Sequence, residues 1–245
     1  AEVAMFRHGD VGHAEDVITE WRKRGNKGHV WIAVESLYSM DGDMAPLDAL
    51  AELADRHGFL LVDEAHATGV YGPKGRGLAH YLEGRENVLT LHTLGKALGG
   101  SGALICGARC LVDFMINRCR PFIFATAPSP LMAAAGQEAL AILDDEPWRR
   151  EALQAHVATF GTEMARRLPQ VPLSGSQIVP LIVGPNAATM ELAAQVQAQG
   201  FDVRGIRPPT VPEGTSRLRV SLTLNVSRAD VVRLAEVLEE LWPAL

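Results

Sequence analysis

Short apolar runs alternate with amphipathic stretches over the first 145 residues of the chain. The apolar runs predict strands at residues 30–34, 59–62, 88–91 and 103–106, and apolar positions at helical spacing predict helices at residues 12–24 and from Pro46 to Gly58. Strands that alternate with helices at this spacing are typical of βαβ units. The pattern therefore predicts an α/β fold with a mainly parallel sheet.

The second part of the chain carries its own helix and strand pattern. An apolar stretch at residues 122–126 predicts a short strand, residues 131–143 predict a long helix, and the segment Asp144-Asp145-Glu146-Pro147 predicts a domain boundary. We therefore expect residues 1–145 to form part of a larger domain and residues 146–245 to form a smaller α/β domain. The elements predicted in the smaller domain are helices at 148–168, 187–199 and 227–241, and strands at 178–183, 201–206 and 218–222.

Polar side chains follow several of the predicted strands. They are Ser39, Asp63, His66, Thr93 and Lys96. In parallel α/β sheets, ligands bind beyond the carboxyl ends of the strands. The shared position of these residues predicts a binding or catalytic site at that edge.

Lys96 is the candidate nucleophile of this site. Its sequence neighbours are apolar or glycine and offer no partner charge. A lysine held in such surroundings loses proton affinity, and its neutral amine can form a Schiff base. The ordinary alternative is a surface lysine in a glycine-rich turn. Asp63 could hold a pyridinium nitrogen protonated, and its ordinary alternative is a helix cap or a surface carboxylate.

Two further motifs resemble functional motifs of other classes of protein. The sequence from Asp63 to His66 spells the DEAH box of nucleotide-driven helicases, but that function needs an upstream phosphate loop, which the sequence does not contain. Asp41 and Asp43 resemble a metal-binding D-x-D motif. Because Asp-Gly-Asp commonly forms a turn, we expect a turn there and no metal.

The C-terminal region offers candidate substrate contacts. Arg217 and Arg219 alternate along a predicted strand, so both should point to one face, where one of them could clamp a carboxylate. Solvent-facing or salt-bridged arginines are the alternative. Thr210 lies in a proline-framed loop, where it could equally be a plain loop hydroxyl.

The composition of the chain argues against several classes of binding partner. The chain has 245 residues and a formal net charge of −6, which argues against nucleic acid because phosphate binding needs a basic surface. No apolar run approaches the ~20 residues needed to span a bilayer. The three cysteines show no CxxC spacing, so we expect neither a zinc nor a disulfide framework, and a reducing, cytoplasmic location.

Four motifs in order resemble the α-oxoamine synthases, pyridoxal-phosphate (PLP) enzymes of fold type I. They are Ser39-Met40-Asp41-Gly42-Asp43, Asp63-Glu64-Ala65-His66-Ala67-Thr68-Gly69, Thr93-Leu94-Gly95-Lys96, and residues 207–219. The resemblance implies a PLP-binding large domain, a small C-terminal domain and decarboxylative condensation of an amino acid with an acyl thioester. Residues 206–212 are most similar to the members that serve biotin synthesis from L-alanine and a pimeloyl thioester. Glycine or serine with another acyl group is the alternative.

The same resemblance implies a role for each matching residue. Lys96 would carry the Schiff base, Asp63 would pair with the pyridine nitrogen of the cofactor, and His66 would pair with its phenolic oxygen. Ser39 would contact the cofactor, Thr93 would bind its phosphate, and Thr126 would reach the phosphate in a neighbouring subunit. Arg219 would bind the amino-acid carboxylate, and Thr210 would line the substrate pocket. A homodimer with sites at its interface is therefore expected.

The beginning of the chain matches the middle of this family. Family members carry a further N-terminal region that stacks on the cofactor ring and helps to hold its phosphate. We therefore expect either a fragment or a chain completed by a partner, and a non-catalytic homologue is the alternative to an enzyme.

Overall fold

The computed structural model describes residues 2–242, and contacts within the chain divide it into two compact units. The first unit contains the residues up to 37 together with residues 44–146. The second contains residues 38–43 and those from 147 onward. The short segment Tyr38–Asp43 therefore belongs with the second unit, and each unit has its own hydrophobic core.

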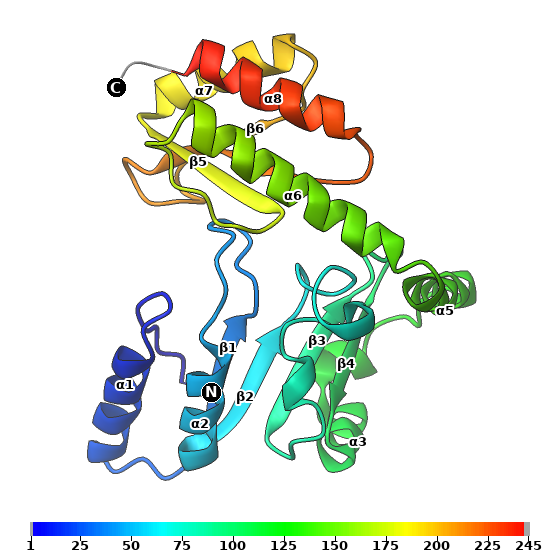
Figure 1. Ribbon diagram of the computed structural model, residues 1–245. Coiled ribbons are helices and arrows are strands. Elements are labelled where there is room, and N and C mark those ends of the chain that lie inside the picture. The colour runs from blue at the N-terminus through cyan, green and yellow to red at the C-terminus, as the bar shows by residue number, and fades with distance from the viewer. Residues whose placement is uncertain (1, 243–245) are drawn as a thin grey trace. The chain divides into compact units, whose positions relative to one another are not determined.

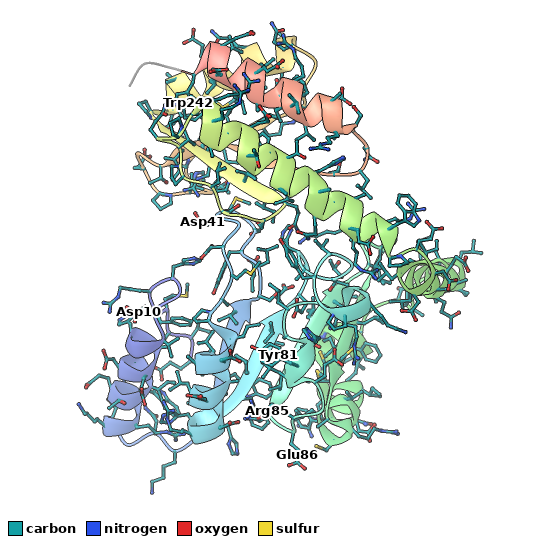
Figure 2. All side chains as sticks on the ribbon, viewed as in Figure 1. Asp10, Asp41, Tyr81, Arg85, Glu86 and Trp242 are labelled. Carbon is teal, nitrogen blue, oxygen red and sulfur yellow. The ribbon has the colours of Figure 1, made fainter. Side chains whose placement is uncertain are left out.

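The elements of the first unit follow the predicted alternation of helix and strand (Figure 1). They are α1 (Val11–Lys23), β1 (Val30–Glu35), α2 (Leu47–His57), β2 (Gly58–Asp63), η1 (Pro73–Gly75), η2 (His80–Leu82), β3 (Val88–Thr93), β4 (Ala103–Gly107), α3 (Arg109–Arg118), α4 (Arg120–Ile123) and α5 (Pro130–Asp145). Asp10 begins α1, because its carboxylate accepts a hydrogen bond from the backbone N–H of His13 (Figure 2). Gly58 joins α2 to β2 at a point where a Cβ atom would lie 2.2 Å from the carbonyl oxygen of Val30.

The sheet of the first unit has the order β1-β2-β3-β4. β1, β2 and β3 are parallel, as predicted, whereas β4 runs antiparallel to β3. The connection between β3 and β4 explains the exception. Residues 94–102 are too few for the crossover that a parallel neighbour needs, which takes about a dozen residues or more.

The two faces of this sheet differ in what covers them. Side chains alternate along strands, and the register pairs Val34 with Val62 and Val62 with Thr90, so these three side chains share one face. We call it the inner face, because it packs against α1 and α2 in one buried cluster. The opposite, outer face is more exposed: Trp31, stacked on Phe59 at 4.5 Å between ring centroids, keeps 49% of its surface accessible.

The second unit is a three-stranded sheet with helices. Its elements are α6 (Trp148–Arg167), β5 (Ile178–Gly184), α7 (Asn186–Ala198), β6 (Arg204–Ile206), β7 (Ser216–Ser221) and α8 (Arg228–Leu241). The strand order is β5-β7-β6, with both pairs antiparallel. Apolar residues of all three helices pack with those of β5 and β7 into one core. The predicted strand at 201–206 is shorter than expected, since only residues 204–206 pair with β7.

The predicted strand at residues 122–126 is wrong. α4 covers Arg120–Ile123, and residues 124–126 lie in a turn and coil. Pro121 explains the difference, because it has no N–H to give to a sheet and its fixed φ suits the first turn of a helix. The preceding helix, α3, was not predicted: Phe114 and Ile116 are exposed, so no one-sided apolar stripe marks it.

Candidate active site

Asp63 and Thr93 end neighbouring parallel strands on the same face of the sheet. Asp63 is in register with Leu91, and Thr93 lies two residues further along β3. Because side chains alternate along a strand, all three point to the outer face. Strand spacing and rise place the Cα atoms of Asp63 and Thr93 about 8 Å apart. The carboxylate of Asp63 and the hydroxyl of Thr93 thus lie at the same edge of the sheet, where β2 and β3 end, within the span of one small ligand.

Lys96 lies in the loop that joins β3 to β4. The loop is closed by hydrogen bonds from the Leu94 N–H to the Gly102 carbonyl (2.9 Å) and from the Gly100 N–H to the Leu94 carbonyl (2.7 Å). Leu94 and Leu98 are buried, whereas Lys96 is exposed. The expected apolar surroundings of Lys96 are therefore not what the structure shows, because the two leucines turn inward and leave the lysine at the surface.

The Asp63 carboxylate is fixed by the turn that follows it. Its Oδ1 accepts a hydrogen bond of 2.8 Å from the backbone N–H of Ala65. This turn carries His66, and both Asp63 and His66 are half-buried. A carboxylate has two oxygens, so one can hold a turn while the other binds a cationic group. Asp63 can therefore cap the turn that follows it, as the sequence allowed, and still bind a ligand.

Ser39 and Arg219 come together in the second unit. The guanidinium Nε of Arg219 donates to the Ser39 carbonyl oxygen at 2.6 Å, and its second nitrogen donates to Ser221 Oγ at 2.8 Å. These two predicted site residues are 180 positions apart in the sequence. Arg219 therefore helps to hold the segment that carries Ser39.

Arg217 is the more deeply buried arginine of β7. Its side chain is 5% exposed and pairs at 2.5 Å with Asp41, which is labelled in Figure 2. Arg217 also donates to the carbonyl oxygens of Met40 (3.3 Å) and Thr215 (3.0 Å). The two arginines bind neighbouring positions of one segment, in agreement with the predicted shared face. The expected turn lies slightly earlier, at residues 39–41, and the N–H of Gly42 (φ 67°) donates to the Tyr38 carbonyl oxygen at 2.9 Å directly after it.

The two remaining threonines of the predicted site lie in loops, Thr126 in the first unit and Thr210 in the second. Thr210 is exposed in the loop after β6, where its N–H donates to the Arg207 carbonyl at 3.1 Å. Thr126 is exposed in the coil between α4 and α5. Both threonines are therefore exposed at the surface of their own units.

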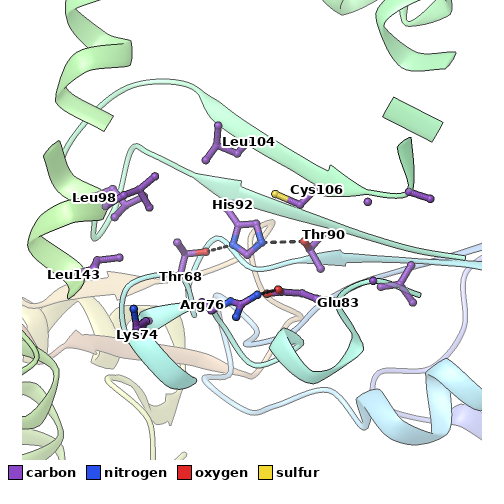
Figure 3. A pocket seen from close by; sticks show the side chains of 16 residues that line it. Thr68, Lys74, Arg76, Glu83, Thr90, His92, Leu98, Leu104, Cys106 and Leu143 are labelled. Carbon is purple, nitrogen blue, oxygen red and sulfur yellow. Dashed lines mark hydrogen bonds and ion pairs between the residues drawn. The ribbon is translucent and has the colours of Figure 1, made fainter. Parts of the chain in front are cut away.

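A polar network on the inner face of the sheet was not predicted from the sequence. The His92 ring bridges two hydroxyls, with Nδ1 2.8 Å from Thr68 Oγ1 and Nε2 2.9 Å from Thr90 Oγ1 (Figure 3). These three residues line a cavity of about 440 Å³ whose other walls include Leu98, Leu104 and Leu143. The available signal was the alternation of Thr90 and His92 with apolar residues, which places both on one face.

The hydrogen bonds of this network fix the tautomer of His92. Thr68 Oγ1 donates its proton to the Glu64 carbonyl oxygen (2.8 Å), so Nδ1 of His92 must donate to Thr68. Nε2 then accepts from the Thr90 hydroxyl in a neutral ring. Burial lowers the pKa of His92, which favours this neutral form. His92 therefore links β3 to the turn after Asp63.

The fold and the edge residues define an α/β chain with a carboxylate, a hydroxyl and a lysine at the carboxyl ends of two parallel strands. Residues 1–238 match the family described as Aminotransferase class I and II. The chain belongs to this family.

Among the relatives is the 8-amino-7-oxononanoate synthase of Anaeromyxobacter dehalogenans, with 44% identity over 100% of this chain and 62% of the relative. A putative enzyme of the same name from Geobacillus kaustophilus is 43% identical over 92% of this chain and 58% of the relative. A solved structure of SPT (serine palmitoyltransferase) with its PLP internal aldimine has a TM-score of 0.87 and 25% identity over 98% of this chain and 61% of that one. The predicted resemblance to α-oxoamine synthases is confirmed. The chain spans about three fifths of the length of these relatives.

Proposed function

We propose that this protein is a PLP-dependent enzyme that condenses L-alanine with a pimeloyl thioester, as an 8-amino-7-oxononanoate synthase in biotin synthesis. The products would be 8-amino-7-oxononanoate, CO2 and the free thiol carrier. The observation that carries the proposal is the placement of Asp63 and Thr93 on one face of one strand edge, with Lys96 in the adjoining loop. The identity of 44% to a relative of that name over the whole chain supports it.

The residues at this edge suit PLP. Asp63 offers a fixed carboxylate for a protonated ring nitrogen, and His66 lies three residues further on, in the turn that Asp63 caps. Thr93 Oγ1 already accepts the Gly95 N–H at 3.2 Å, so a hydroxyl and a glycine-rich backbone lie together where a phosphate would bind. The exposed Lys96 amine follows directly. This donor set matches the charge and hydrogen-bonding groups of the cofactor.

PLP, when bound, supplies an electron sink for a carbanion at the amino-acid Cα. In this proposal Lys96 holds the cofactor covalently between turnovers and removes the Cα proton of bound L-alanine. Asp63 keeps a negative charge beside the ring nitrogen and so stabilises its protonated form. The electron pair left at Cα would form a bond to the thioester carbonyl carbon as the thiolate leaves and takes up a proton from solvent. The carboxylate would then depart as CO2, and Lys96 would return its proton to Cα, which completes the balance.

The second unit would supply the amino-acid contacts. Arg219 presents a guanidinium next to the Ser39 segment, and a guanidinium binds carboxylates through paired hydrogen bonds. Thr210 offers an exposed hydroxyl for the acyl pocket, and Ser39 a contact to the cofactor. In domain terms, residues 1–145 would be part of the PLP-binding large domain and residues 146–245 the small domain.

A homodimer with Thr126 serving the neighbouring subunit is part of the proposal. Large apolar side chains are exposed on both sides of Thr126 in the sequence; they include Phe114, Ile116, Phe122, Ile123, Phe124, Leu131 and Met132. A two-fold interface would cover the same side chains on both chains and remove their apolar surface from water. A cytoplasmic location is also proposed. In the described part of the chain, no helix is long and apolar enough to cross a membrane.

The test is to supply PLP and compare substrate pairs. We expect thiol release and a product of the mass of 8-amino-7-oxononanoate from L-alanine with pimeloyl-CoA or a pimeloyl carrier protein. We expect less than about a tenth of that rate with glycine or L-serine, because a missing methyl or an added hydroxyl changes the fit in the pocket. Sedimentation of the same preparation should show two chains per particle.

Other outcomes separate the alternatives. A higher rate with L-serine and a long-chain acyl-CoA would favour an activity like that of SPT, the class of the structural neighbour. Thiol release with no amino acid would indicate simple hydrolysis. PLP binding without turnover of any pair would contradict the enzyme proposal and favour a non-catalytic homologue.

A further inference from the structure

Glu64 is a buried carboxylate between two proposed cofactor residues. It directly follows Asp63 and precedes His66 by two positions, yet it is 0% exposed. The alternation Leu60, Val62, Glu64 continues the inner face of the sheet past the end of β2. A carboxyl group in such a place is costly unless hydrogen bonds satisfy it. Its partners therefore indicate what it does.

Both carboxylate oxygens of Glu64 accept hydrogen bonds from separate parts of the first unit. Oε2 accepts from Ser36 Oγ, just past β1, at 2.7 Å and from the Leu78 N–H at 3.1 Å. Oε1 accepts from the Ala79 N–H at 2.5 Å. All three partners are donors, so the side chain acts as an acceptor on both oxygens. It joins the end of β1 to the far end of the glycine-rich loop that follows β2.

The backbone of Glu64 holds the near end of the same loop. Its N–H donates to the Leu91 carbonyl on β3 at 2.8 Å. Its carbonyl oxygen accepts from the Thr68 N–H and the Thr68 hydroxyl, both at 2.8 Å. Thr68 in turn contacts His92 on β3. One residue thus fixes β1, β3 and both ends of the loop that contains His66.

The loop backbone is shaped to reach this carboxylate. Gly77 has φ 97°, and a Cβ atom there would lie 2.6 Å from the Glu64 carboxyl carbon. Only glycine combines this backbone conformation with so close an approach. The close contact places the Leu78 and Ala79 N–H groups on the carboxylate, and it makes the shape of the loop depend on Glu64.

We propose that Glu64 is a positioning residue that sets the orientation of Asp63 and His66 toward the PLP ring. This inference rests on the proposed function. Asp63 and His66 sit on either side of Glu64 in a turn whose hydrogen bonds converge on it. If the carboxylate is lost, the loop moves relative to the end of β2, and the Asp63 oxygens move with it.

The test compares Glu64→Gln with wild type in the PLP-loaded protein. Glutamine has nearly the same shape, but its NH2 group would face an N–H or O–H donor in place of an accepting oxygen. We expect kcat to fall about 10- to 100-fold with KM within about threefold, since misplacement of catalytic groups lowers the rate of the bound complex. The midpoint of the pH-dependent absorbance of bound PLP should also shift by about half a unit or more, because it reports the charges near the ring.

Two controls make the result specific. Glu83→Gln removes a carboxylate that lies beyond the loop, pairs with the Arg76 side chain and makes no contact with Glu64, and it should leave kcat and the PLP absorbance midpoint unchanged. Ser36→Ala removes one donor to Glu64 and keeps the carboxylate, so a three- to tenfold fall in kcat with a smaller shift of the midpoint is expected. Amide hydrogen exchange of residues 65–79 should become faster in both Glu64→Gln and Ser36→Ala.

The outcomes distinguish this inference from the proposed function. A folded Glu64→Gln protein with unchanged kcat and absorbance midpoint overturns the positioning role. If Glu64→Gln does not fold, an unchanged midpoint and kcat in Ser36→Ala overturn it. If wild type binds PLP but turns over no substrate pair, the proposed function fails. The absorbance midpoint and the exchange of residues 65–79 then still decide the role of Glu64.

Discussion

Replacing Lys96 with alanine is expected to reduce turnover by about 1,000-fold or more, because the variant loses both the covalent attachment and the Cα base. The fold should remain. Lys96 is exposed in a loop that Leu94 and Leu98 anchor, so the substitution removes little buried surface. Thiol release from L-alanine and pimeloyl-CoA measures the loss, and circular dichroism with thermal unfolding measures the fold.

The matched control for this substitution is Lys23→Ala. Lys23 is 66% exposed on α1 and pairs with Glu20, so its loss should leave turnover and the thermal unfolding midpoint unchanged. Substantial activity in a homogeneous Lys96→Ala protein would refute the role of the lysine. Global unfolding of Lys96→Ala would instead indicate a structural role.

Replacing Asp63 with asparagine should slow turnover by about 100- to 1,000-fold while PLP still binds, since a preorganised charge in such a site is worth several kcal/mol. Asparagine keeps the oxygen that accepts the Ala65 N–H, so the turn should persist. It loses the negative charge that holds the ring nitrogen protonated. Single-turnover exchange of the alanine Cα proton, measured by NMR in deuterated water, follows the affected step directly.

Asp55→Asn provides the corresponding control. Asp55 lies on α2, is 42% exposed and pairs with Arg85. The charge that this substitution removes is therefore distant from the end of β2 that carries Asp63. We expect Cα proton exchange in this variant within about twofold of wild type. Exchange in Asp63→Asn at nearly the wild-type rate would show that the carboxylate does not act on the ring.

The parts of the site that could be predicted from sequence are those set by local pattern. Apolar runs mark where strands begin and end, so the positions of Asp63 and Thr93 at strand ends follow directly from the sequence. Their common face follows from the register, which the parallel βαβ pattern implies but does not specify. The exposure of Lys96 did not follow, because the neighbouring residues do not tell which of them turn inward.

The parts that could not be predicted depend on contacts between distant residues. Arg217 and Asp41 pair across 176 positions, and no local signal links them. Glu64 could be placed on the inner face by alternation, but its partners at Ser36 and Ala79 depend on how the loop folds back. The helix at α4 was missed because the aromatic residues after Pro121 favour a strand by intrinsic propensity, while no strand within residues 2–242 pairs with them.

The most direct test of the central claim is to locate the covalent attachment of PLP. The sequence contains only four lysines, Lys23, Lys27, Lys74 and Lys96, so the possible labelled peptides are few. The protein is incubated with PLP, reduced with sodium borohydride, digested and analysed by mass spectrometry. We expect stoichiometric label on the peptide that contains Lys96 and none in Lys96→Ala. Label on Lys23, Lys27 or Lys74 in place of Lys96 would contradict the assignment of the site.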